Sequence, residues 1–501
     1  MVTTAARHDD RADPIGADPI GAGPAGAGRR TRPPRLTLAS LVGLAFAAVG
    51  AFLGATPLHD NSLFTHIATG RLLVHGGLGQ LWNGMADPYT RFGAGRSWVV
   101  QSWLPSYAYA LVERGVGAGG IRVLMAALTG VLAWLLWRLS APAVTLLPRI
   151  ALVGAALVVG STAWSQRPFL VGLVLLAVVL LAADGRVDPR WLVPAMWVWV
   201  NSHGSFPFAV VALVALAVGA RLDGRPVGAE LRALGWCVAG IVAGGVASPV
   251  GPKLLVFPVM MLRRHDALTR VVEWRSPSFD ETWTRAFLVV VLAVVLGVAR
   301  RPSYRAAVPA VVFVAAALLA QRNLAPALVV LVPAAATGLA GLGSVRGDEQ
   351  GGLLRVAAVV VAAGAAASVA GAVAGADAFA LDAYPVAATT WLDQHGLLGP
   401  QTVLAHPDYV GNYLELREGT RVPVFVDDRY ELHDATLASQ TAGLVRGVPS
   451  WDDILRDRGA DVVLWERSTP LGSLLEADNT AWRVAYRDDR WLVACRPDVA
   501  C

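Results

Sequence analysis

Charged side chains are scarce in this sequence. Asp, Glu, Lys and Arg make up 16% of its 501 residues, whereas hydrophobic residues make up 55%. A soluble domain carries about 25% charged residues, so this chain has too little charge to cover a surface that faces water. The composition therefore excludes an ordinary soluble protein and indicates a protein embedded in a membrane.

Lysine and cysteine are scarcer still. Lys253 is the only lysine, so arginine carries the net charge of +5, and the sequence contains no recognisable nucleic-acid-binding module. The three cysteines are too few for a disulfide scaffold. Cys237 lies inside an apolar block, where we expect a small buried side chain. Cys495 and Cys501 lie close together in sequence, which leaves open whether they form a disulfide.

The apolar residues are gathered into long blocks rather than spread at helical or strand spacing. Blocks of about 17 to 25 residues match the hydrocarbon thickness of a bilayer. We therefore predict an α-helical polytopic membrane protein with about eleven spanning helices. The blocks lie at 36–56, 120–138, 149–164, 168–184, 191–203, 205–221, 233–249, 286–300, 305–320, 324–342 and 353–376.

The positions of the arginines predict how the chain is oriented. Residues 1–35 combine several arginines with many Gly, Pro and Ala residues, which predicts a disordered tail on the cytoplasmic side. Five later turns are flanked by arginine and are predicted to face the cytoplasm as well. The remaining turns and the C-terminal part then lie outside the cytoplasm. The five turns are 138–149, 184–190, 221–232, 300–305 and 346–355.

Two long polar regions interrupt this pattern. A first external loop at 57–119 lies within the transmembrane domain, residues 36–376. Its stretch 102–116 is amphipathic, which predicts an interfacial or re-entrant helix. Charged residues return in 377–501, where we predict an extracytoplasmic α/β domain. Its predicted strands are 402–405, 422–426, 461–465, 482–486 and 491–495, and its predicted helices are 387–395 and 451–458.

Two aspartates of the first external loop stand where local structure begins. Asp60 precedes an amphipathic stretch that contains His66 and Arg71, and Asp87 directly precedes Pro88. From the residues alone, Asp60 is interpreted as a helix N-cap and Asp87 as a turn residue. A role in chemistry is the alternative for both.

Several motifs resemble those of the GT-C superfamily of membrane glycosyltransferases. An acidic residue directly after the first spanning helix, then many helices and an extracytoplasmic α/β domain, is the plan of that superfamily. The chain is similar to a bacterial group with this plan from residue 36 onward. The matching residues are Asp60, His66–Arg71, Asp87–Thr90, Trp98, Gln101–Leu104, Arg167, Pro168, Trp199, Asn201, His203, Gly204, Glu273, Trp274, Ser276, Pro277, Arg322, Asn323 and Val426–Tyr430.

The resemblance implies an enzyme that uses a polyprenyl-phosphate-linked sugar. In the superfamily an external carboxylate acts as a base on the acceptor hydroxyl or helps to hold a metal ion, which implies catalytic roles for Asp60 and Asp87. The metal would be divalent, Mg or Mn, but no ligand set is recognisable, because His59 and His66 lack metal-site spacing. The sequence departs from the family in two respects. Asp60 is followed by Asn61 rather than a second acid, and residues 377–501 lack the Trp-Trp-Asp motif of oligosaccharyltransferases.

Residues of the external turns are predicted to bind substrate. Arg167 and Arg322 each lie in a short turn between spanning helices, where a charge is costly unless it faces a polar cavity, and a guanidinium suits a lipid phosphate. Snorkelling to the interface or capping of a helix is the alternative. His203 interrupts two apolar helices and is a further pocket candidate, with simple turn packing as its alternative. His66, Arg71 and Glu273 join this predicted set through the resemblance.

A charged cluster follows the predicted strand 422–426. Asp427, Asp428 and Arg429 come directly after its apolar run. The carboxyl ends of strands in α/β domains often bind ligands, so these three residues are also predicted to bind substrate. A structural Asp–Arg pair that anchors the domain on the membrane part is the alternative.

Together these features predict a membrane glycosyltransferase. It would transfer a sugar from a polyprenyl-phosphate donor to a glycan, lipid or protein acceptor outside the cytoplasm, with membrane lipid and donor lipid as partners and no nucleic acid. A transporter or flippase is one alternative, although no charged residue is centred in a span and no clear repeat is present. A non-catalytic scaffold of the cell envelope is the other alternative.

Overall fold

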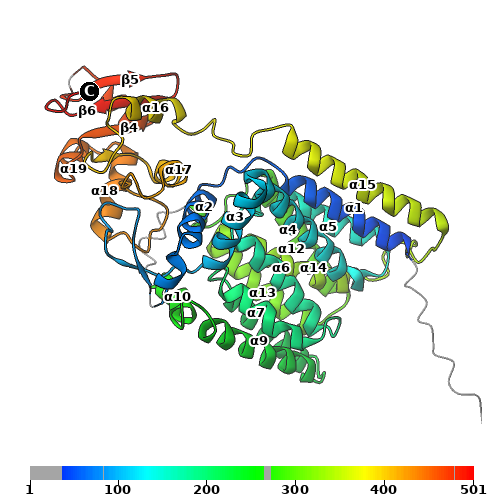
Figure 1. Ribbon diagram of the computed structural model, residues 1–501. Coiled ribbons are helices and arrows are strands. Elements are labelled where there is room, and N and C mark those ends of the chain that lie inside the picture. Colours follow the sequence, from blue (N-terminus) through cyan, green and yellow to red (C-terminus); the bar gives the residue numbers. More distant parts are fainter. Residues whose placement is uncertain (1–35, 83, 264–271, 479) are drawn as a thin grey trace, which may run out of the picture.

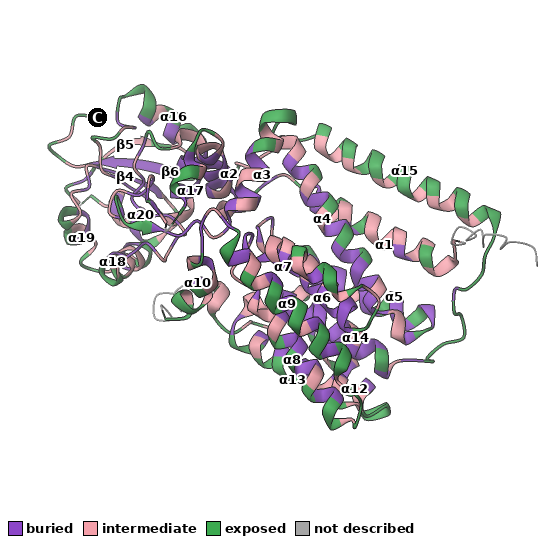
Figure 2. Ribbon diagram, turned by 60° about the horizontal axis from the view of Figure 1, so that its bottom comes forward, coloured by how far each residue is buried: buried purple, intermediate pink, exposed green. Residues whose placement is uncertain are grey.

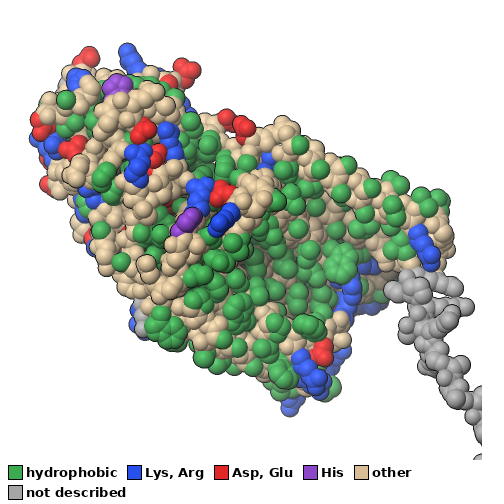
Figure 3. Space-filling view, in the orientation of Figure 1, with side chains coloured by type: hydrophobic (Ala, Val, Ile, Leu, Met, Phe, Trp, Pro, Cys, Tyr) green, Lys and Arg blue, Asp and Glu red, His purple; other side chains and the backbone are tan. Residues whose placement is uncertain are grey.

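The protein has a large helical part and a smaller C-terminal domain at one end of it (Figure 1). The computed structural model describes residues 36–82, 84–263, 272–478 and 480–501, so the predicted tail 1–35 lies outside the described residues. Hydrophobic side chains cover the flank of the helical part, while charged side chains gather on the C-terminal domain and at the opposite end (Figure 3). This distribution is what a bilayer around the helical part would favour.

The helical part contains spans of very different length. Five of the helical segments that the structure describes are long and apolar enough to cross a membrane: Ala118–Ala143, Leu146–Ala163, Gly228–Val246, Thr282–Arg300 and Gly352–Ala374. Shorter apolar helices accompany them, which fits a polytopic membrane fold, while the number of about eleven spans stays a prediction. The helices are α1 (Leu38–Gly54), α2 (Asn61–Val74), α3 (Trp103–Val116), α4 (Ala118–Leu139), α5 (Leu146–Ala163), α6 (Phe169–Ala183), α7 (Leu192–Val200), α8 (Pro207–Leu222), α9 (Gly228–Val246), α10 (Lys253–Leu262), α12 (Thr282–Arg300), α13 (Tyr304–Leu319), α14 (Leu324–Gly338) and α15 (Gly352–Ala374).

The turns between the helices gather at two ends of the bundle. At one end, Arg305 in the first turn of α13 pairs with Asp184 after α6 at 2.9 Å and with Glu230 in α9 at 2.8 Å. At the other end, Arg167 after α5 pairs with Glu273 before α12 at 2.7 Å. Turns that the sequence places on the same side of the membrane therefore lie at the same end of the bundle. Which end faces the cytoplasm stays a prediction.

Helix α15 lies along α1 at the edge of the bundle and has no buried residue (Figure 2). The buried side chain of Arg122 in α4 joins the ends of these helices. It donates hydrogen bonds to the carbonyl oxygens of Ala55 after α1, Ala372 in α15 and Ala376 after α15. The last carbonyls of a helix lack partners within the helix, so a guanidinium there both satisfies them and opposes the negative end of the helix dipole.

The first external loop folds into α2, α3 and a short hairpin of β1 (Met85–Ala86) and β2 (Ser97–Trp98). Gly70 permits α2 to approach α3 closely, because a Cβ at this position would lie 1.9 Å from the carbonyl oxygen of Ser106. The opposite neighbour of α2 is α17 (Asp408–Glu418) of the C-terminal domain, which lies beside it in Figures 1 and 2. Helix α2 therefore connects the bundle with the C-terminal domain.

The C-terminal domain is built on a four-stranded sheet in the order β3-β4-β6-β5. Strand β3 (Leu404–Ala405) runs parallel to β4 (Val462–Glu466), whereas β6 (Trp491–Cys495) is antiparallel to both β4 and β5 (Arg483–Arg487). Helices α16 (Val386–Gln394), α18 (Ala435–Arg446), α19 (Trp451–Asp457) and α20 (Pro470–Leu475) accompany α17 around it. The predicted strands near 404, 462, 483 and 491 and the predicted helices near 387 and 451 are confirmed.

The predicted strand 422–426 is wrong. Its only ladder contact among the described residues is a single bridge between Val424 and Thr90 of the first external loop. Val422, Val424, Phe425 and Val426 are buried nonetheless. The apolar run thus reflects burial where the C-terminal domain meets the external loop, not membership of the sheet. The sequence cannot separate these two causes, because both require the same side chains.

The cysteines have separate roles. Cys495 and Cys501 form a disulfide across a Cα–Cα distance of 6.6 Å, which answers the question that their spacing left open. Cys237 is free and buried within α9, as its apolar surroundings predict.

Candidate functional site

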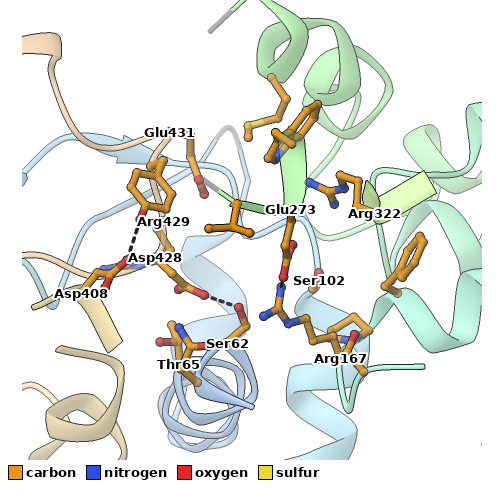
Figure 4. A pocket seen from close by; sticks show the side chains of 18 of the residues that line it. Ser62, Thr65, Ser102, Arg167, Glu273, Arg322, Asp408, Asp428, Arg429 and Glu431 are labelled. Atoms are coloured by element: carbon orange, nitrogen blue, oxygen red, sulfur yellow. Dashed lines mark hydrogen bonds and ion pairs between the residues drawn. The ribbon is translucent and has the colours of Figure 1, made fainter. Parts of the chain in front are cut away.

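A cavity of about 920 Å³ lies where the bundle meets the C-terminal domain. Its walls come from α2, the turns after α5 and α7, residues 272–275, residues 321–322 and residues 426–433. Figure 4 shows charged side chains from these segments pointing into the cavity. Its size lies within the range of roughly 300–1,000 Å³ that small-molecule sites occupy.

Arg167 lies in the cavity wall between two carboxylates. Its Nε donates to both oxygens of Asp60, at 2.8 and 2.6 Å, and its Nη1 donates to Glu273 at 2.7 Å. Burial by itself lowers the pKa of Arg167, but the charges of Asp60 and Glu273 outweigh burial and raise the pKa above its ordinary value. Arg167 is therefore a fixed cation whose charge is largely compensated by its two partners.

Asp60 contacts Arg167 on the side that faces away from the cavity. It is the N-cap of α2, where its Oδ1 accepts a hydrogen bond from the backbone N–H of Ser62 at 3.0 Å. Its side chain is only 7% exposed and does not line the cavity. The N-cap geometry is present as interpreted from the sequence. The catalytic role of Asp60 stays a prediction, and both of its oxygens are engaged by Arg167.

Arg322 is a second cation of the cavity, and it differs from Arg167 in its partners. It lies in the turn between α13 and α14, with its guanidinium carbon 4.4 Å from the centre of the Trp274 ring. Among the described residues no hydrogen bond or ion pair engages its guanidinium, which points into the cavity. Burial, followed by the charge of Arg167, lowers its pKa, against the opposing effect of Glu273. Arg322 is half-buried, and a partly desolvated guanidinium without an anionic partner among the described residues is costly, so this position favours an anionic ligand.

Asp428 supplies a carboxylate to the opposite wall of the cavity. Ser62 of α2 donates a short hydrogen bond to its Oδ2, and Asn412 of α17 donates to its Oδ1 at 2.6 Å. Burial is the main cause that raises the pKa of Asp428 to about 6, and the hydrogen bond from Ser62 offsets it only in part. A carboxylate with a pKa near the working pH can be ionised and still accept a proton effectively.

Two of the three described histidines that line the cavity, His66 and His203, are held as neutral groups. The Nδ1 of His66 lies 3.1 Å from the hydroxyl of Ser106, and the ring of His203 packs against Phe169. Burial, followed by the charges of Arg167 and Arg429, lowers the pKa of His66 to about 3. Burial, followed by the charge of Arg322, lowers the pKa of His203 well below its ordinary value. Both rings can therefore exchange hydrogen bonds with a ligand without adding charge.

Arg429 forms a buried ion cluster at the edge of the cavity. It pairs with Asp427, with Asp87 at 3.0 Å and with Glu415 at 3.5 Å, and its guanidinium lies over the ring of Trp98. Burial by itself raises the pKa of Asp427, but the charge of Arg429 outweighs it and lowers this pKa. Asp87 comes from the external loop and Asp427 from the C-terminal domain, so the cluster fastens the two together. This matches the anchoring alternative for Asp427 and Arg429.

The predicted site residues thus fall into two groups. His66, Arg167, His203, Glu273, Arg322, Asp428 and Arg429 line the cavity. Asp60, Arg71, Asp87 and Asp427 do not. Arg71 instead pairs with Glu113 at 2.7 Å and donates to the carbonyl oxygen of Leu416, while Asp87 accepts hydrogen bonds from its own turn at Tyr89 and Thr90. The roles predicted for these residues in catalysis and binding remain predictions.

The sequence did not identify several polar residues of the site. Ser62, Asp408 and Glu431 line the cavity, and Asn412 donates a hydrogen bond to Asp428. Ser62 and Asn412 meet at Asp428 although they lie 350 positions apart in the chain (412 − 62). No local pattern announces such a contact. The position of Glu431 directly after the Asp427–Tyr430 motif was the one available signal.

The resemblance of the sequence motifs implies that a divalent metal could bind at this site. Among the residues that the structure describes, no group of three or more His, Cys, Asp or Glu side chains is arranged to hold a metal ion. The cavity carboxylates of Asp428 and Glu273 are each engaged by other protein groups. The described residues therefore do not fit a metal centre, and the chemistry is derived from the protein's own side chains.

Comparison with protein-family models and with curated proteins finds no match. Among solved structures, the chain resembles the archaeal oligosaccharyltransferase AglB from Archaeoglobus fulgidus, in complex with an inhibitory peptide and a dolichol-phosphate. The identity is 12% and the TM-score 0.40, over 85% of this chain and 69% of that one. It also resembles the arabinofuranosyltransferase AftD from Mycobacteria, with 16% identity and a TM-score of 0.42.

This second likeness covers 92% of the present chain and 42% of the length of AftD. Likenesses at these TM-scores carry no argument about activity, so function is inferred from the chemistry of the cavity. Both solved structures are membrane glycosyltransferases of the GT-C superfamily, the group that the sequence motifs resemble.

Proposed function

We propose that this protein is a membrane glycosyltransferase that moves a sugar from a polyprenyl-phosphate-linked donor to an acceptor outside the cytoplasm. One observation carries the proposal. A half-buried arginine without an anionic partner among the described residues, Arg322, shares a cavity with Asp428, a carboxylate whose pKa is raised to about 6 by burial. A transfer from a lipid phosphate requires these two groups, a cation for the leaving phosphate and a base for the acceptor.

In the proposed reaction, the acceptor hydroxyl attacks the anomeric carbon of the donor sugar. The bond between that carbon and the phosphate oxygen breaks, and its electron pair leaves with the phosphate. Asp428 takes the proton of the attacking hydroxyl. Arg322 stabilises the negative charge that grows on the phosphate, and a guanidinium can do so through two parallel hydrogen bonds.

Asp60 is a positioning residue in this proposal. It fixes Arg167 through both oxygens and thereby aligns one wall of the phosphate site. Glu273 fixes the same guanidinium from the cavity side at 2.7 Å. We therefore propose Asp428, rather than Asp60 or Asp87, as the base, since neither of the other two aspartates lines the cavity.

Two features support an extracytoplasmic location of the site. The C-terminal domain contains a disulfide, Cys495–Cys501, and disulfides persist mainly outside the cytoplasm. The bundle end away from this domain carries arginines such as Arg186 and Arg225 in its short turns, which is typical of cytoplasmic loops.

Binding of the lipid phosphate tests the proposal directly. A polyprenyl phosphate is titrated into the detergent-purified protein, with the matching polyprenol as the ligand that lacks phosphate. We expect Arg322→Gln to weaken binding of the phosphate about tenfold or more, since it removes a charged hydrogen-bond donor from the cavity wall. Arg114→Gln is the matched control, because Arg114 is exposed at the end of α3 outside the cavity. Equal affinity of wild type and Arg322→Gln, or equal binding of polyprenol, would contradict the proposal.

A further inference from the structure

A second pocket, of about 420 Å³, lies beside the cavity. It is formed where the start of α2, the linker between α15 and α16, and α17 come together. Its size again lies within the range of roughly 300–1,000 Å³ that is usual for small-molecule sites. The residues that line it are His59, Asn61, Ala380, Asp382, Ala383, Tyr384 and Tyr409.

The second pocket borders the cavity through shared and consecutive residues. Asn61 lines both, and Asp408 of the cavity is followed in the chain by Tyr409 of the pocket. The Nδ2 of Asn61 donates to the Oδ1 of Asn412 at 3.4 Å, and Asn412 in turn donates to Asp428 at 2.6 Å. A molecule in the second pocket would therefore lie one side chain away from the network of the proposed base.

Aromatic rings form one wall of the second pocket. The rings of Tyr384 and Tyr409 lie 6.1 Å apart, edge to face. Tyr384 is held in place by the rings of Phe64 at 5.2 Å and Tyr413 at 5.4 Å, and Tyr409 by the ring of Trp491 at 6.2 Å. Tyr409 is half-buried and Tyr384 is 9% exposed, so a ligand would meet the part of these rings that faces the pocket, and their packing removes the entropic cost of ordering them on binding.

The polar groups of the second pocket suit a neutral ligand rich in hydroxyl groups. Asp382 is exposed, and in the described part of the chain its carboxylate has no hydrogen bond or ion pair. His59, another lining residue, contacts the carbonyl oxygen of Pro57 through its Nδ1 at 3.0 Å. No Lys or Arg is among the lining residues, so the pocket does not favour a phosphate. The second pocket carries the negative charge of Asp382, whereas the cavity carries the positive charge of Arg322.

We propose that the second pocket binds the neutral saccharide end of the acceptor. The carbon–hydrogen face of a sugar ring would pack on Tyr384 and Tyr409, while Asp382 accepts hydrogen bonds from its hydroxyl groups. The sugar beyond it would extend past Asn61 to bring a hydroxyl to Asp428. The assignment as an acceptor subsite rests on the proposed glycosyltransferase function, whereas the binding of a neutral saccharide can be measured without it.

The test measures binding and transfer separately. Saturation-transfer NMR on the full-length protein in detergent uses the methyl glycosides of glucose, galactose and mannose and the disaccharides maltose and cellobiose, at up to about 10 mM, which reaches weak small-ligand sites. We expect saturation of at least one of these sugars by wild-type protein and about a tenfold loss of affinity in Asp382→Ala. Asp453→Ala is the matched control, since Asp453 is an exposed aspartate in α19 outside both pockets.

The outcomes separate this inference from the proposed function. Saccharide saturation that is lost in Asp382→Ala but kept in Asp453→Ala supports the subsite, whatever the protein does with a lipid donor. Absence of saturation in wild type, or equal saturation in wild type and Asp382→Ala, overturns the subsite. The proposed function then stands or falls with lipid-phosphate binding at Arg322. In a transfer assay, Asp382→Ala should raise the acceptor KM and leave the donor KM unchanged.

Discussion

At the residue scale, Arg167 and Arg322 of the cavity differ in their interaction partners. Arg167 has carboxylate partners on both sides, whereas the guanidinium of Arg322 contacts the ring of Trp274. A guanidinium between two carboxylates has little net charge left for a ligand, while an aromatic contact leaves the charge available. Donor affinity should therefore depend most on Arg322, and Arg167 chiefly shapes the site.

The substitution Asp60→Asn distinguishes a positioning role of Asp60 from a catalytic one. The amide can still cap α2, but it removes the charge that fixes Arg167 at 2.6 Å. We expect the donor KM to rise about tenfold with a smaller change in kcat, because a charged hydrogen bond at the binding wall is weakened. Steady-state kinetics with the lipid donor measure both constants. A loss of kcat with an unchanged donor KM would instead identify Asp60 as the base.

The proposed base gives the activity a pH dependence. Burial raises the pKa of Asp428 to about 6, and only the ionised carboxylate can accept the proton. We expect kcat/KM to fall about tenfold per pH unit below this pKa and to level off above it. The contribution to folding has the opposite sign: burial favours the protonated form, so this stabilisation is lost as the pH rises through the raised pKa. A pH–rate profile with its acidic limb near the ordinary aspartate pKa would contradict the assignment.

The residues of the site were predictable from the sequence only where their setting is local. Arg167 and Arg322 stand out because a lone charge in a short turn between apolar blocks needs a polar environment. Ser62 and Asn412 do not stand out, since a serine in the first turn of a helix and an asparagine in a helix are ordinary. Their contact with Asp428 exists only because α2 packs against α17.

At the scale of elements, α2 is the helix that joins the two parts of the protein. Its start at Asp60 could be predicted from the capping residue and the amphipathic pattern that follows. Helix α17 was not predicted, because it buries the polar residues Asn412 and Glu415, which a sequence pattern assigns to the surface. Burial of these side chains becomes tolerable through partners on α2, such as Thr65, which donates to Glu415.

The close approach of α2 and α3 predicts the effect of one added methyl group. In Gly70→Ala, the new Cβ would meet the carbonyl oxygen of Ser106 at 1.9 Å, so the two helices must move apart. We expect a loss of about 1–3 kcal/mol of stability, typical of overpacking, and reduced activity because α2 carries Ser62 and His66. Gly115→Ala in α3 is the control, since a Cβ there meets nothing within 4 Å. Thermal denaturation in one detergent compares the two, and equal effects would contradict the account.

At the scale of the whole molecule, the two ends of the bundle differ in chemistry. The end at the C-terminal domain contains the cavity, with its histidines, carboxylates and Arg322. The other end is held by ion pairs close to its turns, such as those of Arg305 in the first turn of α13 with Asp184 after α6 and with Glu230 in α9. The sequence predicted this division because turns alternate along a polytopic chain. It could not predict the cavity, which depends on where the C-terminal domain docks.

Labelling of cysteines in intact cells tests the proposed orientation. In Cys495→Ala, the half-buried Cys501 loses its disulfide partner, and we expect a membrane-impermeant maleimide to label it in intact cells. The control carries Cys495→Ala, Cys501→Ala and Arg225→Cys, which places a thiol at an exposed turn of the opposite end. We expect its label only after the cells are permeabilised. Labelling of the control alone in intact cells would show that the orientation is reversed.

Transfer of the sugar itself tests the central claim most directly. Wild-type protein and Asp428→Asn are placed in lipid nanodiscs with polyprenyl-phosphate-linked pentoses and hexoses and with saccharide acceptors. We predict that wild-type protein forms glycosylated acceptor and free polyprenyl phosphate in equal amounts. Loss of the base should slow both about a hundredfold or more, with donor binding retained. A wild-type protein that consumes none of these donors, or an Asp428→Asn variant as active as wild type, would contradict the account.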